Sequence, residues 1–243
     1  MTALREHLDL FTLALQRATF LRLGPAAEAE PDPDAVRASL AHLPGAGWVI
    51  GIAACLVFAL FGLLLRASGW GAAVAAIAAT TVTAILTRGR GETAVFRSAE
   101  RLQLLAAPGT SGAGALVLFL LLAAKICLLA AIASLSERGV LATLFAAQVV
   151  SRLAPVLLAR SLDGDVPPRA VQVGAAWCLL PLVLMVPVAS LGALGLAVIA
   201  VTLACYGTWR IARRQAEPAD RDVLAGAQQV CEVAFYLGAA IGL

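Results

Sequence analysis

The sequence contains little charge. Only 14% of its 243 residues are charged, whereas 61% are hydrophobic, and its mean hydropathy is +0.90. A soluble domain usually has about 25% charged and about 45–50% apolar residues, so this composition excludes a soluble globular domain, a disordered chain and a coiled coil. No polar stretch reaches about 50 residues, the lower limit for an aqueous domain. We therefore predict an all-α polytopic membrane helix bundle, with residues 1–243 forming a single integral membrane domain.

Several residue types that build metal and catalytic sites are scarce. Histidine occurs twice, lysine once and asparagine not at all. The five cysteines lie singly inside apolar runs and never form a C-x-x-C pair, so we interpret them as buried packing residues. The absence of a Walker loop, a G-x-S-x-G turn and metal-spaced histidines argues against an ATPase, a serine hydrolase and a zinc enzyme. The net charge of +3 is too small to indicate a nucleic-acid partner.

Apolar runs of the length that crosses a bilayer, about 17–25 residues, recur along the chain. The sequence predicts about seven transmembrane helices within residues 47–243: 48–65, 70–86, 113–135, 140–159, two within 171–209 that divide near 188–190, and 223–243. Leu8, Phe11 and Leu15 recur at helical spacing, which favours an amphipathic surface helix over residues 1–23 rather than a signal peptide. The acidic, proline-rich segment 24–46 is expected to be a cytosolic linker.

Arginine is distributed unevenly between the predicted loops. Fourteen arginines lie in the N-terminal segment and in loops 88–112, 160–170 and 210–222, against two in the intervening loops. Basic residues in short loops mark the cytoplasmic side of a membrane protein. We therefore expect the N-terminus and these three loops to be cytoplasmic.

Three charged residues lie within predicted spans: Lys125, Arg152 and Glu232. A charge at membrane depth costs at least about 2.5–3.5 kcal/mol, so such residues face the protein interior and usually have partners. We expect Glu232 to pair with one of the two cations, which leaves the other for an anionic ligand. A purely structural ion pair is the alternative. Further hydrogen-bonding groups are expected near the same layer, namely Ser151, Gln228 and Gln229.

The cytoplasmic loops carry the other polar candidates. Arg97 and Arg101 are four residues apart and would share one face of a helix, where they could bind phosphate or simply reflect the positive-inside bias. Asp220 and Asp222 could hold Mg²⁺, which takes one or two carboxylates together with substrate phosphates. A solvated loop explains the two aspartates equally well.

Several short stretches resemble those of a known membrane enzyme family. In chain order they are Phe20-Leu21-Arg22-Leu23-Gly24-Pro25, then Pro44, Gly47 and Gly51, then Lys125, then Ser151-Arg152, and finally Asp222, Leu224, Gln228-Gln229 and Glu232-Val233-Ala234-Phe235-Tyr236-Leu237-Gly238. These stretches resemble the cobalamin synthase family, the membrane-bound adenosylcobinamide-GDP ribazoletransferases. The similarity extends over nearly the whole chain in length, order of spans and placement of loops.

The resemblance implies a late step of cobalamin biosynthesis. In that step adenosylcobinamide-GDP is joined to alpha-ribazole, or its phosphate, and GMP is released at the bacterial inner membrane. It also implies corrinoid and nucleotide substrates, contact with membrane lipid, and other cobalamin-assembly enzymes as partners. The residues it points to are Asp222, Glu232 and Glu92 for catalysis, Lys125, Ser151, Arg152, Gln228, Gln229, Arg88 and Arg97 for substrate binding, and Asp220 and Asp222 for Mg²⁺.

One segment departs from the family pattern. Where the family carries an acidic motif with a histidine after the second span, this chain reads TRGRGETAVFRSAERL, which keeps Thr87, Gly89 and Glu92. The arginines there would repel a divalent cation, so we expect weak Mg²⁺ binding and low or absent turnover. A catalytically impaired paralogue that binds corrinoid or scaffolds cobalamin assembly is therefore one alternative. A small transporter is the other, although the two halves of the chain show no internal repeat.

Overall fold

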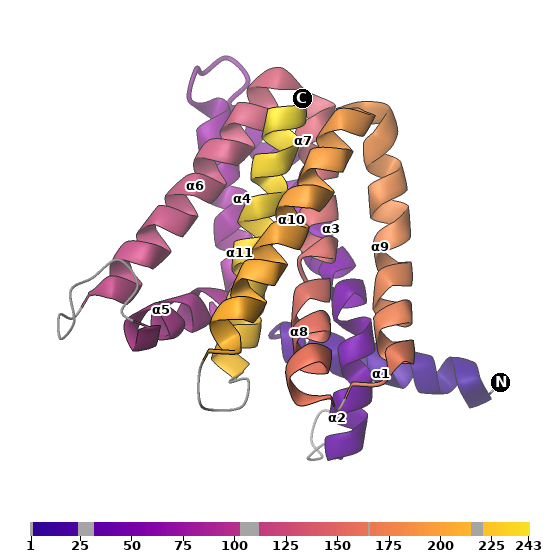
Figure 1. Ribbon diagram of the computed structural model, residues 1–243. Helices are drawn as coiled ribbons and strands as arrows, with labels where there is room; N and C mark the ends of the chain where they lie inside the picture. The colour runs from indigo at the N-terminus through magenta and orange to yellow at the C-terminus, as the bar shows by residue number, and fades with distance from the viewer. Residues whose placement is uncertain (1, 24–31, 103–111, 165, 215–220) are drawn as a thin grey trace.

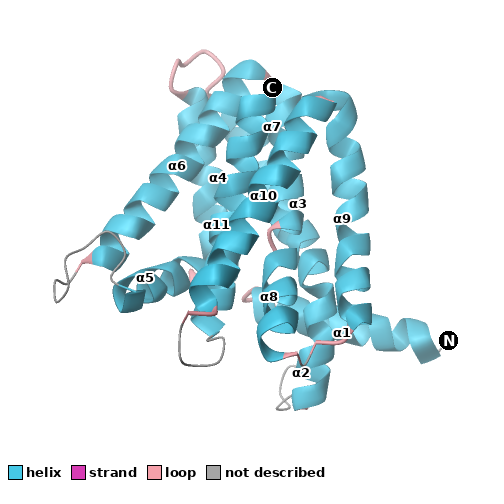
Figure 2. Cartoon of the chain, in the orientation of Figure 1, coloured by secondary structure: helices cyan, strands magenta, loops and turns pink. Residues whose placement is uncertain are grey.

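The described part of the chain is helical throughout and contains no strand. The computed structural model describes residues 2–23, 32–102, 112–164, 166–214 and 221–243 (Figures 1 and 2). Its helices are α1 (Thr2–Ala18), α2 (Pro33–Ser39), the short 3-10 helix η2 (Leu40–His42), α3 (Leu43–Leu64), α4 (Gly71–Thr87), α5 (Arg90–Leu102), α6 (Ala113–Leu135), α7 (Glu137–Val150), α8 (Leu153–Asp163), α9 (Pro168–Ala189), α10 (Leu191–Ala212) and α11 (Arg221–Gly242). The predicted all-α polytopic bundle is confirmed.

Six of the described segments are long and apolar enough to cross a membrane. They are α3 together with α2, α6, the α7–α8 pair, α9, α10 and α11, and α4 with α5 raises the number to seven if that bent pair counts as one span. The expected span 113–135 has the bounds of α6, and the expected division of 171–209 falls at Ser190, between α9 and α10. Apolar run length was therefore a sufficient guide to most of the crossings.

The structure differs from the expected linker over residues 32–46. These residues form α2, η2 and the first turn of α3, while residues 24–31 lie outside the described part. The side chain of Asp32 accepts a hydrogen bond from the backbone N–H of Asp34 at 3.4 Å, and Pro33 opens α2. An N-cap aspartate followed by proline at the first helical position is a helix-start signal, so this local chemistry explains the helix.

The fourth predicted span consists of two helices. α7 ends at Val150 and α8 begins at Leu153, with Ser151 and Arg152 between them. Pro155 provides the physical reason, because proline has no N–H to donate to the carbonyl four residues earlier. In a continuous helix its ring would also clash with that carbonyl, which belongs to Ser151. The Ser151 carbonyl accepts instead from the N–H of Ala154 at 3.2 Å.

The arginine-rich segments lie at one end of the bundle. In Figure 1, α1, α2 and α5 lie at the lower end together with the start of α9 and α11, and the C-terminus lies at the opposite end. α5 turns away from α4 by 88° and so runs across this end. α1 also packs there, with the ring of Phe11 stacked on Trp177 at 5.6 Å and with Ala14 and Leu15 buried. The common position of these segments agrees with the distribution of arginine in the sequence.

Small residues bring α3 against α7. A Cβ atom at Gly47 would lie 2.5 Å from the main-chain oxygen of Gln148, and one at Gly51 would lie 2.9 Å from the ring of Phe145. Glycines spaced four residues apart allow helix backbones to approach closely within a membrane. This contact fixes α7 at Gln148, which is a member of the site described next.

Candidate functional site

One face of α11 carries a polar stripe. The stripe contains four residues at intervals of seven, three and four positions: Asp222, Gln229, Glu232 and Tyr236. These intervals place them on one side of a helix with 3.6 residues per turn. The stripe meets α5 near the arginine-rich end and α6 and α7 deeper in the bundle. The site therefore has an outer part and a buried part.

The buried part is centred on an ion pair. Lys125 Nζ of α6 lies 2.5 Å from Glu232 Oε1, and both side chains are 1% exposed. The expected pairing of Glu232 with one of the intramembrane cations is confirmed, and the partner is Lys125. Such a pair is compatible with membrane depth because each charge neutralises the other.

Two uncharged residues complete the cluster. Gln148 donates its side-chain N–H to Glu232 Oε1 at 2.5 Å, and the Tyr236 hydroxyl donates to the same oxygen at 2.9 Å. Neither residue was predicted from the sequence as a site residue. The available signals were an amide inside the apolar run 140–159 and a tyrosine in the matching stretch at the end of the chain.

Arg152 is the second buried cation, and it is held by neutral oxygens. Its Nη1 donates to the side-chain oxygen of Gln148 at 2.9 Å and to the main-chain oxygen of the same residue. Arg152 is 3% exposed and forms no ion pair within the described residues, although Glu232 and Glu92 act on it electrostatically from a longer distance. Since Lys125 neutralises Glu232, the positive charge of Arg152 is left over. A buried surplus cation with free guanidinium donors suits an anionic ligand.

The outer part joins α5 to α11 near the arginine-rich end. Arg97 Nη1 lies 3.8 Å from Asp222 Oδ2, with exposed side-chain fractions of 62% and 23%. Gln229 donates its side-chain N–H to Glu92 Oε1 at 3.2 Å. Gly91 permits this approach, because a Cβ atom there would collide with the Gln229 amide. The second carboxylate oxygen of Glu92 and the amide oxygen of Gln229 are buried and have no hydrogen-bond partner.

The remaining predicted residues surround these two parts. Ser151 is fully buried at the α7–α8 break and its hydroxyl has no partner, whereas Gln228 is half-buried. Arg88 is exposed at the end of α4 in a left-handed conformation with φ of 56°, and it lines a cavity of about 500 Å³ together with Glu92. Asp220 lies outside the described residues.

Four of the buried side-chain polar atoms without a hydrogen-bond partner lie around this site. They belong to Thr80, Glu92, Ser151 and Gln229, whereas Lys125 Nζ is ion-paired with Glu232. Most buried polar groups in folded proteins are hydrogen-bonded, and exceptions call for an explanation. Here they lie with an unneutralised arginine and a carboxylate that has a spare oxygen. This combination can bind an anion and accept a proton. No group of three potential metal ligands occurs within the described residues.

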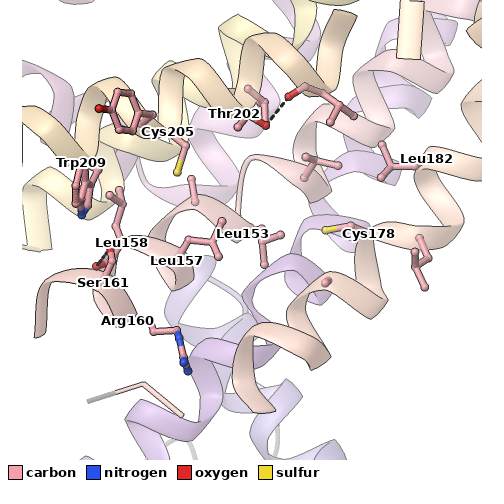
Figure 3. Close-up of a pocket in the computed structure, with 17 residues that line it drawn as sticks. Leu153, Leu157, Leu158, Arg160, Ser161, Cys178, Leu182, Thr202, Cys205 and Trp209 are labelled. Atoms are coloured by element: carbon pink, nitrogen blue, oxygen red, sulfur yellow. Dashed lines mark hydrogen bonds between the residues drawn. The ribbon is translucent and has the colours of Figure 1, made fainter. Parts of the chain in front are cut away.

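A second cavity, of about 770 Å³, borders the break between α7 and α8. Figure 3 shows it between α8, α9 and α10, lined mainly by apolar side chains such as Leu153, Leu157 and Leu182. Its Ser161 and Thr202 hydroxyls donate to main-chain oxygens of their own helices, at 3.1 and 2.7 Å. It contains none of the predicted site residues, so we interpret it as an apolar groove of the bundle.

The fold and the site define a polytopic all-α membrane protein with a charged intramembrane centre that adjoins its basic end. The chain belongs to the cobalamin-5-phosphate synthase family, whose model matches residues 94–240. That range runs from α5 to α11 and includes the whole buried cluster. Arg88 and Glu92 precede it, in the segment where the sequence departs from the family pattern.

Curated relatives match over most of their length. The adenosylcobinamide-GDP ribazoletransferase of Polaromonas naphthalenivorans (strain CJ2) is 32% identical, covering 87% of this chain and 89% of the relative. The protein of the same name from Albidiferax ferrireducens is 34% identical with the same coverage, and that from Azorhizobium caulinodans is 32% identical, covering 90% and 89%. No solved structure matched the chain.

Proposed function

We propose that this chain is an adenosylcobinamide-GDP ribazoletransferase. The observation that carries the proposal is Arg152, a buried cation that forms no ion pair with any described residue and lies within the family-matched region. The corrinoid substrate contains a diphosphate, so it supplies the negative charge that this arginine lacks. The relatives that cover most of the chain carry the same activity in their names.

The reaction forms one P–O bond and breaks another. The 3′-hydroxyl oxygen of alpha-ribazole, which is also free in the 5′-phosphate, attacks the phosphorus on the corrinoid side of the diphosphate. The bond from that phosphorus to the GMP oxygen breaks, and the hydroxyl proton is released. The products are adenosylcobalamin, GMP and one proton. Catalysis of such a step depends on alignment and on stabilisation of the phosphoryl charge.

Each of these two requirements is met by different residues of the site. Arg152 binds the diphosphate and the Ser151 hydroxyl adds a donor beside it, whereas Lys125 serves as the countercharge of Glu232. Glu92 accepts the proton through its spare oxygen. Glu232 holds Gln148, which in turn orients Arg152. At the outer end, Arg97 and Arg88 attract the anionic substrate, Asp222 holds Arg97, and the amides of Gln228 and Gln229 line the approach.

Mg²⁺ belongs to the proposal as a weakly held cofactor. Mg²⁺ usually binds one or two protein carboxylates together with substrate phosphates and water. Asp222 and Asp220 are the carboxylates that would hold the ion, and the spare oxygen of Glu92 is reserved for the proton. When bound, the ion neutralises the diphosphate. Nearby arginines weaken its affinity because like charges repel.

The proposed location is the bacterial inner membrane, with the N-terminus in the cytoplasm and the site facing the cytoplasmic substrates. This rests on the gathering of the arginine-rich segments at one end of the bundle. Other cobalamin-assembly enzymes would dock at that end. Matched Arg138→Cys and Arg214→Cys variants of a cysteine-free protein test the orientation, since both arginines are exposed. An impermeant thiol reagent should label only the first in intact cells, and equal labelling would contradict this topology.

The activity test uses the purified protein in detergent with adenosylcobinamide-GDP, alpha-ribazole and Mg²⁺. We expect cobalamin and GMP in equal amounts, and loss of at least about 99% of the rate in Arg152→Gln, as is typical when a charged group that stabilises the reacting centre is removed. Arg66→Gln is the matched control, because Arg66 is exposed in the α3–α4 connection. Substrate binding without turnover would instead indicate a catalytically impaired paralogue. Absence of both would leave the transporter hypothesis.

A further inference from the structure

Beside the polar stripe of α11 lies a small apolar slot formed by one face each of α5, α10 and α11, with Val117 of α6 also in its lining. Each face presents residues at intervals of three, one and three positions, which is the spacing of a helical stripe. The stripes are Val95, Ser98, Ala99 and Leu102 of α5, Ala204, Gly207, Thr208 and Ile211 of α10, and Val223, Gly226, Ala227 and Val230 of α11. The slot has a volume of about 300 Å³ and lies near the arginine-rich end, where these three helices meet (Figure 1).

Among the described residues, two polar side chains line this slot, and they differ in their hydrogen bonding. The Thr208 hydroxyl donates to the main-chain oxygens of Cys205 and Ala204, at 2.9 and 3.1 Å. The Ser98 hydroxyl is buried and has no partner. It lies across from Gly226, at 3.8 Å from the position that a Cβ atom would take there. A buried hydroxyl without a partner costs free energy unless a ligand satisfies it.

We infer that this slot binds the benzimidazole base of alpha-ribazole, with the Ser98 hydroxyl donating a hydrogen bond to the unsubstituted ring nitrogen. The inference rests on the proposed function and names the subsite for its second substrate. The base is flat, apolar and bicyclic, and its free ring nitrogen is one acceptor for the one available donor. The small residues Ala99, Gly207 and Gly226 leave room for a planar ring.

The other parts of the substrates fit the slot poorly. Guanine carries several donors and acceptors, which an apolar slot with one free hydroxyl would leave unsatisfied at a large cost. A corrin ring exceeds a volume of about 300 Å³. The position also suits a nucleophile, because Ser98 follows Arg97 on α5, and the slot adjoins the face of α11 that carries Asp222 and Gln229.

Two glycines of α10 provide a matched test. A Cβ atom meets nothing within 4 Å at either Gly207, which lines the slot, or Gly195, which lies outside it. A Cβ atom is therefore tolerated at both positions. Gly207→Leu adds a bulky side chain at the lining of the slot, and Gly195→Leu makes the same change elsewhere on the same helix. Ser98→Ala removes the donor and leaves the space.

The measurements are the Kd of alpha-ribazole by equilibrium dialysis and the KM of each substrate. We expect Gly207→Leu to weaken alpha-ribazole at least tenfold while the KM of adenosylcobinamide-GDP stays unchanged, and Gly195→Leu to behave as wild type. Ser98→Ala should weaken alpha-ribazole about five- to tenfold. It should not change binding of the indole analogue, in which a C–H replaces the ring nitrogen.

The outcomes separate this inference from the proposed function. Turnover by the wild type with unchanged alpha-ribazole affinity in Gly207→Leu would overturn the slot and leave the transferase intact. Binding that depends on Gly207 and Ser98 without any turnover would support the slot and overturn the transferase. A wild-type protein that does not bind alpha-ribazole would overturn both.

Discussion

Lys125–Glu232 and Arg97–Asp222 are ion pairs that join α11 to its neighbours, and their surroundings differ. Lys125 and Glu232 are 2.5 Å apart and 1% exposed, and Gln148 and Tyr236 add hydrogen bonds to the same carboxylate oxygen. Arg97 and Asp222 are 3.8 Å apart, and the arginine side chain is 62% exposed. The first pair lies within the bundle, whereas the second lies at its arginine-rich end.

The difference in burial indicates that the two ion pairs have different roles. A buried pair is costly to break because removal of one partner leaves the other charge without compensation in a medium of low polarity. An exposed pair is screened by water and contributes little to stability, but its arginine can exchange partners with an incoming anion. The buried pair therefore maintains the structure, and the outer pair is free to take part in substrate binding.

The largest expected effect follows from breaking the buried pair. Glu232→Gln or Lys125→Met should destabilise the protein by about 3–5 kcal/mol, because each leaves one buried charge alone. Thermal unfolding in detergent measures this loss. The double variant should recover part of the stability, since neither charge remains. Additive losses in the double variant would contradict the pairing.

A smaller effect is expected from the contact that holds Gln148. Gly47→Ala places a Cβ atom 2.5 Å from the Gln148 main-chain oxygen, so α3 and α7 must separate. Overpacking of this kind costs about 1–3 kcal/mol, and here it also displaces the residue that orients Arg152. Gly62→Ala is the control on the same helix, where nothing lies within 4 Å. Equal melting temperatures for the two variants would show that this contact does not fix α7.

The smallest effect on stability is expected at the outer pair. Arg97→Gln and Asp222→Asn should each change the free energy of unfolding by about 0–1 kcal/mol, because water screens an exposed pair. The two variants should differ in kinetics: Arg97→Gln raises the KM of adenosylcobinamide-GDP, and the rise shrinks at high salt. A destabilisation as large as that of Glu232→Gln would remove the distinction between the two pairs.

The sequence predicted the crossings well because run length and polarity determine them. Residues 113–135 contain a single charge and form α6 with the same bounds. It also identified Lys125, Arg152 and Glu232, since a charge in an apolar run is costly. The helix α2 escaped prediction although Asp32 and Pro33 form a helix-start signal, because the acidic composition of the segment suggested a linker.

The partner of Glu232 could not be predicted from the sequence. Lys125 and Arg152 are both single cations within spans, and only the packing of α6 and α7 against α11 decides between them. Gln148 and Tyr236 were missed because an amide or a hydroxyl in a span is common and costs less than a charge. Their importance arises from three helices that meet at one carboxylate oxygen, which no local pattern in the sequence reveals.

The central claim is that Arg152 binds the diphosphate, whereas the Lys125–Glu232 pair maintains the structure. The Kd of adenosylcobinamide-GDP, measured by equilibrium dialysis on wild type, Arg152→Gln and the double variant Lys125→Met/Glu232→Gln, tests it most directly. We predict binding about a hundredfold weaker in Arg152→Gln and within about threefold of wild type in the double variant, because a hydrogen-bonded charge pair is worth a few kcal/mol once it is desolvated. Wild-type affinity in Arg152→Gln, or loss of binding in the folded double variant, would contradict the claim.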